Sequence, residues 1–372
     1  MSFAKSTLDA LQEALALHKQ GQLEEAGQRY REVLEAEPNH PSALHLMGLL
    51  AVQQEKPEEA LDWLGKALAA NPRSPVCHSD LGLVLCGLER FDAAELAFRR
   101  ALELQPQFPE ALRNLGNLQR EFGFLDRAAS CYEQALAQQA DYSEASESLR
   151  ALQKTRENLA AFVQAMKQAR TSSPPERPDH LARLKLERRE LFPLVLNELG
   201  LKGVGAEVGV QQGKFSERIL RVWEGRALYS IDPWREFSAT EYADVSNVSQ
   251  AKQDGNYLET LRRLMPFHRR SIVWRLTSRE AADLLPDQNL DFAYIDADHS
   301  YRGVSEDIRL WYPKVKPGGV LAGHDYCTDG QYWFGDFGVQ HAVNEFVEAS
   351  KLDLFLCDEP EGGFLTWVVI KR

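Results

Sequence analysis

LDFAYIDADHSYRGVSEDIRLWYPKVKPGGVLAGHDY, residues 290–326, is the stretch that decides the fold of the C-terminal half. Its apolar run at 292–295 reads as a buried strand, and a helical stretch follows over about 301–312. A Pro-Gly-Gly turn at 317–319 then leads into a second apolar run at 320–322. This strand–helix–strand order predicts a βαβ unit with parallel strands.

A polar cluster follows each of the two predicted strands. Asp296, Asp298 and His299 follow the first strand, and His324 and Asp325 follow the second. Because the carboxyl ends of parallel strands meet at one edge of the sheet, where open α/β sheets bind ligands, we expect the clusters to converge. Carboxylates and imidazoles brought together can form a metal site or an acid–base site. Asp298 is expected to cap the helix or face solvent.

Length and composition limit the class of protein. The 372 residues predict two domains, and 44% apolar with 26% charged residues is typical of a soluble globular chain. A formal charge of −12 disfavours nucleic acid as a partner. No apolar stretch is long enough for a membrane span, and the N-terminus lacks the features of a signal peptide. Five scattered cysteines without a C-x-x-C pair predict reduced thiols and a cytoplasmic location.

An internal repeat occupies the first half of the chain. Alanine recurs every 34 residues, at Ala26, Ala60, Ala94 and Ala128. A large residue follows each alanine by four positions, at Tyr30, Leu64, Phe98 and Tyr132. Proline ends the first three units, at Pro38, Pro72 and Pro106. The pattern resembles the tetratricopeptide repeat over about residues 7–142, because small residues let paired helices approach and proline stops the second helix.

The segments after the repeats set the predicted domain boundaries. Residues 143–170 are predicted to form one amphipathic helix that caps the repeats, so the first domain is 1–170. Three prolines within 171–180 make that segment the linker, and 181–372 the second domain. Residues 181–200 show helical spacing, with a kink or break at Pro193. The groove of such a repeat array suits a protein partner; a spacer or dimerisation surface is the alternative.

The second domain opens with a glycine-rich turn. A short strand at 204–208 leads into Gly209 and Gly213, and a helix begins near residue 214. Asp232 ends the next strand, 25 residues after Glu207, where an acid can accept hydrogen bonds from ribose hydroxyls. The missing third glycine and Glu207 favour an adenosyl cofactor without phosphates over a dinucleotide.

Several motifs in order carry a family resemblance: AEVGVQQGKFSE, SIDPW, SREAADLL, FAYIDADHSYRGVSEDI and KPGGVLAGHDY, followed by GVQHAVNEF. Residues 181–372 resemble class I S-adenosylmethionine-dependent methyltransferases, and more narrowly the family of macrocin-type sugar O-methyltransferases. The resemblance implies an α/β Rossmann-like, seven-stranded methyltransferase fold behind the all-α tetratricopeptide repeat superhelix.

The resemblance also implies roles for individual residues in binding S-adenosylmethionine. Glu207, Gly209 and Gly213 would surround the methionine end of the cofactor. Asp232 would hold the ribose, and Ser278 would lie near the adenine.

At the polar rim the resemblance implies a metal-assisted reaction. Asp296, His324 and Asp325 would be the metal ligands, and His299 would be the general base. Oxygen ligands favour Mg²⁺, but such enzymes usually have an acidic or acid–amide pair where His324 and Asp325 stand. The imidazole therefore leaves Mn²⁺ or Fe²⁺ open.

Two loops are expected to handle the acceptor. Residues 234–256 could form a lid, and the aromatic loop 327–338, with Trp333, could bind a sugar ring. The predicted function is O-methylation of a sugar hydroxyl in a glycan, glycolipid or glycosylated natural product. The alternatives are a protein or peptide methyltransferase, a repeat scaffold with a degenerate methyltransferase fold, and, from the His and Asp residues at the rim, a hydroxylase on a related fold.

Overall fold

The computed structural model describes residues 7–171, 182–186, 188–238, 246–328, 330–332, 335–357 and 364–372. The chain forms two compact units, Met1–Leu152 and Gln153–Arg372. The division lies inside helix α9 (Ser143–Thr171), whereas the sequence predicted it at 171–180, a segment that lies almost wholly outside the described residues.

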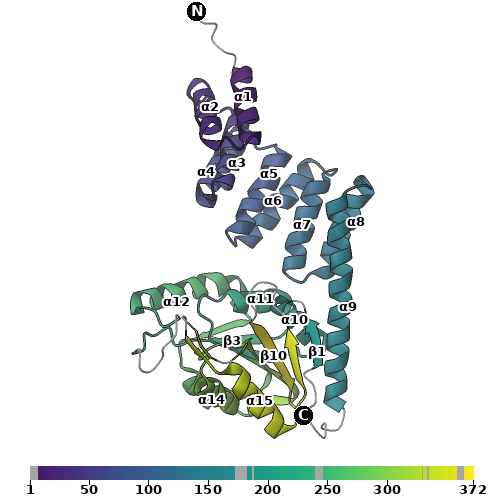
Figure 1. Ribbon diagram of the computed structural model, residues 1–372, viewed down its shortest axis with the longest axis vertical. Coiled ribbons are helices and arrows are strands. Elements are labelled where there is room, and N and C mark those ends of the chain that lie inside the picture. Colours follow the sequence, from purple (N-terminus) through teal and green to yellow (C-terminus); the bar gives the residue numbers. More distant parts are fainter. Residues whose placement is uncertain are drawn as a thin grey trace, which may run out of the picture. The chain divides into compact units, whose positions relative to one another are not determined.

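The described part of the N-terminal unit is helical, and consecutive helices pack as four pairs ahead of α9 (Figure 1). These helices are α1 (Thr7–Lys19), α2 (Leu23–Ala36), α3 (Pro41–Gln53), α4 (Pro57–Ala70), α5 (Pro75–Gly87), α6 (Phe91–Leu104), α7 (Pro109–Glu121) and α8 (Leu125–Gln138). Each pair corresponds to one predicted repeat unit, so the period found in the sequence is confirmed as a structural period.

Close packing within each pair explains the repeated small residues. The four alanines of the repeat and the four large residues are all fully buried. A Cβ added to Gly82 in α5 would lie only 2.5 Å from the ring of Phe98 in α6, so glycine is needed where the ring fills the space between the helices. Gly116 stands in the same relation to Tyr132, at 2.6 Å. The predicted helix stops are also confirmed, because α2, α4 and α6 each end two residues before a proline.

Helix α9 is continuous, as predicted, but it serves both units. Near its start, Tyr142 and Ala145 are buried together with Leu112 of the last helix pair. Farther along, Phe162 is fully buried and its ring packs edge-on against Phe355, with the centroids 5.7 Å apart, inside the C-terminal unit. The predicted capping role therefore applies only to the first part of α9.

An eight-stranded sheet forms the centre of the C-terminal unit, with the strand order β1-β9-β10-β6-β5-β2-β3-β4. These strands are β1 (Ala182–Leu186), β2 (Val204–Val208), β3 (Ala227–Ile231), β4 (Ser271–Trp274), β5 (Leu290–Ile295), β6 (Val315–Tyr326), β9 (Leu354–Cys357) and β10 (Leu365–Ile370). All neighbours are parallel except β10, which is antiparallel to β6 and to β9. The seven predicted strands are all present, and the C-terminal strand β10 is the one that runs against its neighbours.

Helices cover both faces of this sheet, with α10, α11 and α12 on one side and α14 and α15 on the other (Figure 1). The helical segments of the unit are η1 (Arg189–Leu191), α10 (Phe192–Glu198), α11 (Lys214–Val222), α12 (Gln250–Leu264), η2 (Met265–Phe267), α13 (Ser278–Leu284), α14 (Tyr301–Trp311) and α15 (Val339–Ser350). A separate pair of short strands, β7 (Gly330–Tyr332) and β8 (Gly335–Phe337), follows β6. No helix among the described residues has the length and apolar character needed to cross a membrane.

The helical prediction for 181–200 was wrong in its first part. Residues 182–186 form β1, which pairs in parallel with β9 and adds an eighth strand to the predicted seven. Without β1, the strand β9 would be an open edge with unpaired backbone groups. Pro193 does not kink a longer helix, because it stands in the first turn of α10, where its missing N–H has no partner to lose.

Candidate active site

A cavity of about 620 Å³ lies at the carboxyl ends of the parallel strands in the C-terminal unit. Among the predicted site residues, those that line it are Glu207, Gly209, Asp232, Ser278, Asp296, His299 and Asp325. Gly213 and His324 are not among the residues that line it. The structure thus brings the predicted cofactor residues and the predicted rim residues into one site of a size that suits a nucleoside cofactor.

The glycine-rich turn after β2 requires glycine at two places. Gly209 has a φ of +90°, and a Cβ there would lie 1.9 Å from the backbone oxygen of Asp296, so no side chain fits. Gly213 has a φ of +74° at the start of α11, and a Cβ there would lie 3.0 Å from Thr260. The turn therefore packs tightly on one side and exposes its backbone to the cavity on the other.

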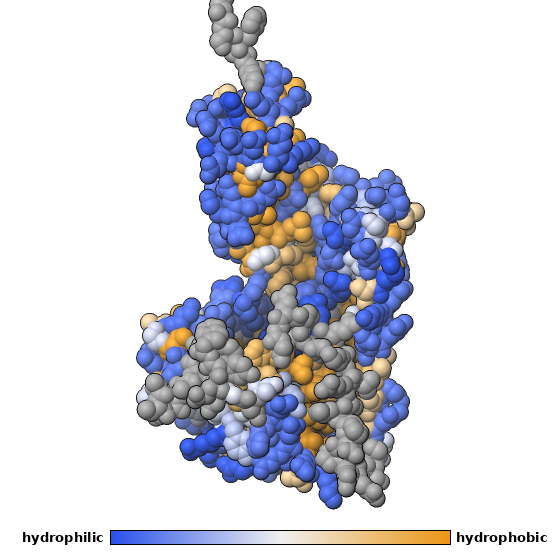
Figure 2. Space-filling model, viewed as in Figure 1, coloured by the Kyte–Doolittle hydropathy of each residue, from blue (hydrophilic) through white to orange (hydrophobic). Residues whose placement is uncertain are grey.

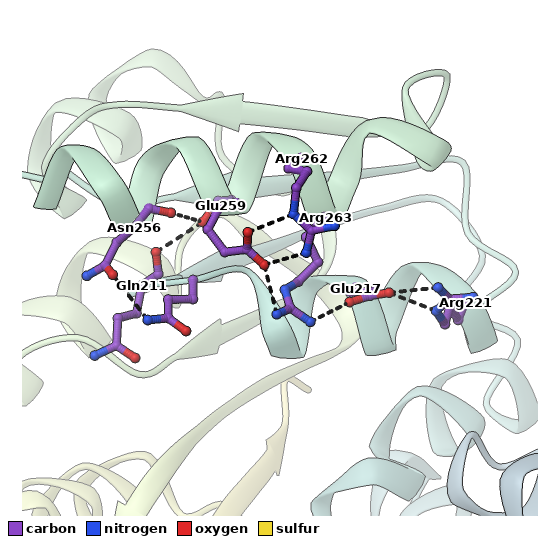
Figure 3. Close-up of polar contacts among 9 residues, drawn as sticks. Gln211, Glu217, Arg221, Asn256, Glu259, Arg262 and Arg263 are labelled. Atoms are coloured by element: carbon purple, nitrogen blue, oxygen red, sulfur yellow. Dashed lines mark hydrogen bonds and ion pairs between the residues drawn. The ribbon is translucent and has the colours of Figure 1, made fainter. Parts of the chain in front are cut away.

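Helix α12 holds this turn in place, as Figure 3 shows around Gln211 and Asn256. The carbonyl oxygen of Gln211 accepts hydrogen bonds from Thr260 Oγ1 at 3.0 Å and from Trp234 Nε1 at 2.7 Å. An ion-pair network fixes α12 to α11, since Arg263 bridges Glu217 and Glu259 with both nitrogen–oxygen distances at 3.0 Å (Figure 3). This support could not be predicted from local sequence pattern, because its members come from two helices that are distant along the chain.

Asp232 follows β3 and accepts three backbone hydrogen bonds. Its Oδ2 accepts from the N–H of Val210 at 3.1 Å and of Gln211 at 2.9 Å, and its Oδ1 accepts from Trp234 at 2.7 Å. Burial raises the pKa of Asp232, and these backbone N–H groups act against that shift by stabilising the carboxylate. Oδ2 already accepts two of these bonds, whereas Oδ1 accepts one and can accept another, so the predicted ribose contact is compatible with this geometry.

Glu207 lies on β2 and its side chain is buried beneath the cavity, with only 1% of the residue exposed. Its Oε2 accepts a hydrogen bond from Ser216, whose hydroxyl also lies 2.7 Å from that of Ser230. Burial raises the pKa of Glu207 to about 8, although the Ser216 hydrogen bond acts in the opposite direction. At neutral pH this side chain is therefore mostly a neutral acid that can donate a hydrogen bond.

This raised pKa gives a testable pH dependence. Between pH 4.5 and about pH 8 the folded chain keeps a proton on Glu207 that the unfolded chain releases. The contribution of this group to stability is therefore fully present below pH 4.5 and is lost as the pH rises to about 8. The difference in unfolding free energy between Glu207→Gln and wild type should therefore shift in favour of the variant by roughly 2–5 kcal/mol from about pH 4 to about pH 9. Urea unfolding of both proteins at the two pH values measures this difference. The exposed Glu224→Gln is the control, and an equally flat difference for both variants would contradict the prediction.

The rim residues form a compact cluster. One ligand atom each from Asp296, His299 and Asp325 lies within 4.8 Å of the others. His299 Nε2 is 2.9 Å from Asp325 Oδ2 and 3.9 Å from Asp296 Oδ1. The β5–β6 register explains the convergence, because Ile295 pairs with Gly323 and the next residues on each strand are Asp296 and His324. Two carboxylates and an imidazole fit a divalent cation such as Mn²⁺ or Mg²⁺.

Asp325 lies between two imidazoles. Its Oδ1 is 3.1 Å from Nδ1 of His324, whereas its Oδ2 contacts His299. The same nitrogen of His324 lies 3.8 Å from Asp296 Oδ1. Burial would raise the pKa of Asp325, but hydrogen bonds from His299 and His324 hold that pKa well below its usual range. Its backbone has a φ of +59°, an unfavourable conformation for an aspartate that turns the carboxylate toward the cluster.

Two neighbours of the cluster escaped the sequence analysis. Arg189 of η1 places Nη1 3.6 Å from Asp296 Oδ2 and lies over the ring of Phe215, with Cζ 5.1 Å from its centroid. Phe337 of β8 stacks on the imidazole of His299, with centroids 4.8 Å apart and an interplanar angle of 15°. Arg189 lies in the stretch that the sequence assigned to a helix, and Phe337 lies in the loop 327–338, which was expected to contact the acceptor and not His299.

The other predicted contacts have mixed outcomes. Ser278 lines the cavity, but its hydroxyl donates a hydrogen bond to Asp307. Asp298 caps the following turn, since its Oδ1 accepts from the N–H of Ser300 at 2.9 Å. Trp333 and part of the predicted lid, residues 239–245, lie outside the described residues.

Comparisons with known families agree with this arrangement. The sequence profile of a family described as a methyltransferase domain matches residues 206–326. Profiles of two families described as tetratricopeptide repeats match residues 17–80 and 79–144. No curated protein matches the chain in sequence.

Solved structures resemble part of the chain. MamA from Desulfovibrio magneticus RS-1 is 23% identical, with 37% of this chain and 77% of that chain covered and a TM-score of 0.34. YrrB, described as a TPR protein with an unusual peptide-binding site, is 27% identical, with coverage of 41% and 79% and a TM-score of 0.35. PilF from Pseudomonas aeruginosa is 18% identical, with coverage of 51% and 83% and a TM-score of 0.39.

The two kinds of family profile match the two structural units in chain order, and the methyltransferase match spans the strands that surround the cavity. A domain of this kind implies S-adenosylmethionine as the cofactor. The chain therefore combines tetratricopeptide repeats with a methyltransferase domain.

Proposed function

We propose that this chain is a cytoplasmic, metal-assisted O-methyltransferase that acts on a sugar hydroxyl of a glycan, glycolipid or glycosylated natural product. The observation that carries the proposal is that the carboxylate–imidazole cluster of Asp296, His299 and Asp325 lines the same cavity as Gly209 and Asp232. A nucleophile activated at the cluster would thus lie beside the cofactor residues. Five cysteines without disulfide bonds support a reducing compartment.

The residues around the cofactor have distinct tasks in this proposal. S-adenosylmethionine, when bound, supplies a methyl group that is already activated on a sulfonium. Gly209 leaves room for its close approach, Asp232 accepts hydrogen bonds from the ribose hydroxyls, and the neutral Glu207 supports the turn from below. The protein then has to orient the acceptor and remove its proton.

His299 is the proposed general base. A sugar hydroxyl is a far weaker acid than an imidazolium, and a gap of about six pKa units makes direct proton transfer unfavourable by roughly 8 kcal/mol. A divalent cation, when held by Asp296, Asp325 and His324, would stabilise the negative charge that develops on the acceptor oxygen. Phe337 and Asp325 keep the imidazole of His299 at the cavity wall, where it can take the proton.

The cation site has a direct test. We expect Asp325→Ala to weaken Mn²⁺ binding about 100-fold, because the variant removes the carboxylate between the two imidazoles. Electron paramagnetic resonance of free Mn²⁺ measures the affinity without any need for turnover. Asp298→Asn is the matched control, since it changes a nearby cavity carboxylate outside the cluster. Equal Mn²⁺ affinities for wild type and Asp325→Ala would contradict the proposed ligand set.

The repeat unit is proposed to dock a protein partner or the carrier of the substrate. Large apolar side chains are exposed on its helices, including Val52, Val76 and Leu83, each more than 40% exposed. Figure 2 shows apolar surface on the repeat helices in the viewed face, amid hydrophilic residues. Exposed apolar side chains on a repeat array support protein docking in preference to a spacer.

The acceptor class can be tested with radiolabelled S-adenosylmethionine. The intact chain would be incubated with Mg²⁺ or Mn²⁺ and three acceptor panels: glycosides and glycolipids, unstructured peptides, and a buffer blank. The proposal predicts transfer to the sugar panel that EDTA suppresses. Transfer to peptides alone would replace it with protein methylation, and no transfer to any panel despite cofactor binding would remove the sugar assignment.

A further inference from the structure

Asp307 is an acidic residue of the cavity wall to which neither the sequence motifs nor the proposed mechanism gives a role. It lies on α14 and is only 5% exposed, yet it lines the cavity together with Ser278 of α13. A carboxyl group in this position is unfavourable unless it has hydrogen-bond partners. The hydrogen bonds of Asp307 therefore indicate which kind of ligand group it can bind.

A directed chain of hydrogen bonds ends on Asp307. The indole Nε1 of Trp311 donates to Ser278 Oγ at 2.8 Å, and the Ser278 hydroxyl donates in turn to Oδ1 of Asp307. Because the indole N–H can only donate, the Ser278 proton has to point toward the carboxylate. Trp311 is itself fully buried, so this direction is fixed by groups that have no freedom to rearrange.

The second oxygen of the same carboxylate has no such partner. Within the described residues, no hydrogen bond reaches Asp307 Oδ2. Burial raises the pKa of Asp307 to about 7, and the nearby acids Asp298 and Glu306 act in the same direction. Because Asp307 lines the cavity, this acceptor oxygen is open to a donor group of the ligand.

The place of Asp307 in the fold narrows the choice of ligand group. Asp232 follows β3, and Ser278 stands at the first turn after β4, the strand that pairs with β3. A nucleoside with its ribose at Asp232 would carry its base along this edge of the sheet toward Ser278 and Asp307. The neighbouring acid Glu306 is already paired with Arg279.

We propose that Asp307 selects the exocyclic amino group of the adenine in S-adenosylmethionine, as an acceptor whose orientation Ser278 and Trp311 fix. This inference rests on the proposed methyltransferase function and adds the residue that sets base specificity. A purine with a carbonyl oxygen at the same ring position places an acceptor against an acceptor. In titrations at about pH 9, where Asp307 is ionised, such a ligand should be rejected, because neither group supplies a proton.

The test compares two ligands by calorimetry on the intact chain. S-adenosylhomocysteine carries the amino group, and S-inosylhomocysteine carries a carbonyl oxygen in its place. We expect wild type to prefer the adenosyl ligand by about 10–100-fold, as for other sites that lose a buried hydrogen bond. No methyl transfer is needed for this readout.

The variant Asp307→Asn should reverse the preference. The fixed proton of Ser278 holds the amide oxygen in the place of Oδ1, so the amide NH₂ replaces Oδ2 and offers a donor to the ligand. The inosyl ligand should then bind at least as tightly as the adenosyl ligand. In the double variant Ser278→Ala/Asp307→Asn the amide group can rotate so that either its oxygen or its NH₂ faces the ligand. The affinities for the adenosyl and inosyl ligands should then come within about threefold of each other. Asp283→Asn on the exposed face of α13 is the control and should keep the wild-type ratio.

Each outcome decides the inference. A wild-type ratio retained in Asp307→Asn would overturn it, and equal affinities of wild type for both ligands would do so even if the variant failed to fold. If S-adenosylhomocysteine does not bind wild type at all, the proposed function fails together with the inference. Binding without base discrimination removes the inference alone.

Discussion

His299→Ala is expected to lower kcat for methyl transfer about a thousandfold, which is within the range of a lost general base. The imidazole lies 2.9 Å from Asp325 and is stacked on Phe337, so it is held at the cavity wall. Affinity for S-adenosylmethionine should stay within about threefold of wild type, because His299 acts on the acceptor. Single-turnover transfer to the active acceptor panel measures the first quantity, and calorimetry measures the second.

The same variant tests whether His299 acts as the general base or as a metal ligand. The cluster of ligand atoms includes His299 with Asp296 and Asp325, whereas the sequence motifs placed His324 in that set. If His299 is the base, Mn²⁺ affinity should be unchanged in His299→Ala and lowered in His324→Ala. The opposite pattern would make His299 the metal ligand. His268→Ala, outside the cavity lining, is the control for loss of an imidazole alone.

Asp232→Ala is expected to weaken binding of S-adenosylhomocysteine at least about 100-fold. The substitution removes the predicted acceptor for the ribose hydroxyls, and it also leaves the N–H groups of Val210, Gln211 and Trp234 without their common partner. Those groups belong to the glycine-rich turn and its neighbour, so the cofactor loses both a direct contact and an ordered turn. Calorimetric titration measures the loss.

An asparagine variant divides these two contributions. Asp232→Asn keeps one acceptor oxygen but replaces the other with a donor, so part of the backbone anchoring is retained. We expect its affinity to lie between wild type and Asp232→Ala, and a melting temperature near wild type would show that the fold persists. The exposed Asp283→Ala serves as the control. Wild-type affinity in Asp232→Ala would contradict the assignment of this edge as the cofactor site.

The sequence was sufficient for features that depend on local pattern. The 34-residue period predicted the helix pairs, because each repeat buries the same small and large residues. The βαβ order at 290–326 predicted that Asp296 and Asp325 would converge, because parallel neighbours end at one edge of the sheet. These inferences needed only spacing and the chirality of the connection.

Features that depend on distant contacts were beyond the sequence. Strand β1 was assigned to a helix, because its pairing with β9, more than 160 residues later, is what makes it a strand. Arg189 follows β1 directly and so could not be placed near Asp296. Asp307 lies in a helix, where an acid normally faces solvent; only the packing of α14 against α13 buries it beside Ser278.

The family resemblance predicted the location of Ser278 but not the contact that its hydroxyl makes. The resemblance placed Ser278 near the adenine, and the structure places it on the cavity wall, yet its hydroxyl proton is committed to Asp307. A contact between the serine hydroxyl and the base would have to use its remaining acceptor capacity. In our proposal the group that faces the ligand is the Asp307 carboxylate, which stands near the end of the motif FAYIDADHSYRGVSEDI but received no role from the resemblance.

Calorimetric titration of the intact wild-type chain shows whether the cavity at the ends of the parallel strands binds S-adenosylmethionine. The titration would be run first in EDTA and then with Mg²⁺. We expect one cofactor per chain, with an affinity on the order of micromolar in both conditions, because the cofactor residues are separate from the cation cluster. Absence of binding up to about millimolar cofactor in both conditions would contradict it.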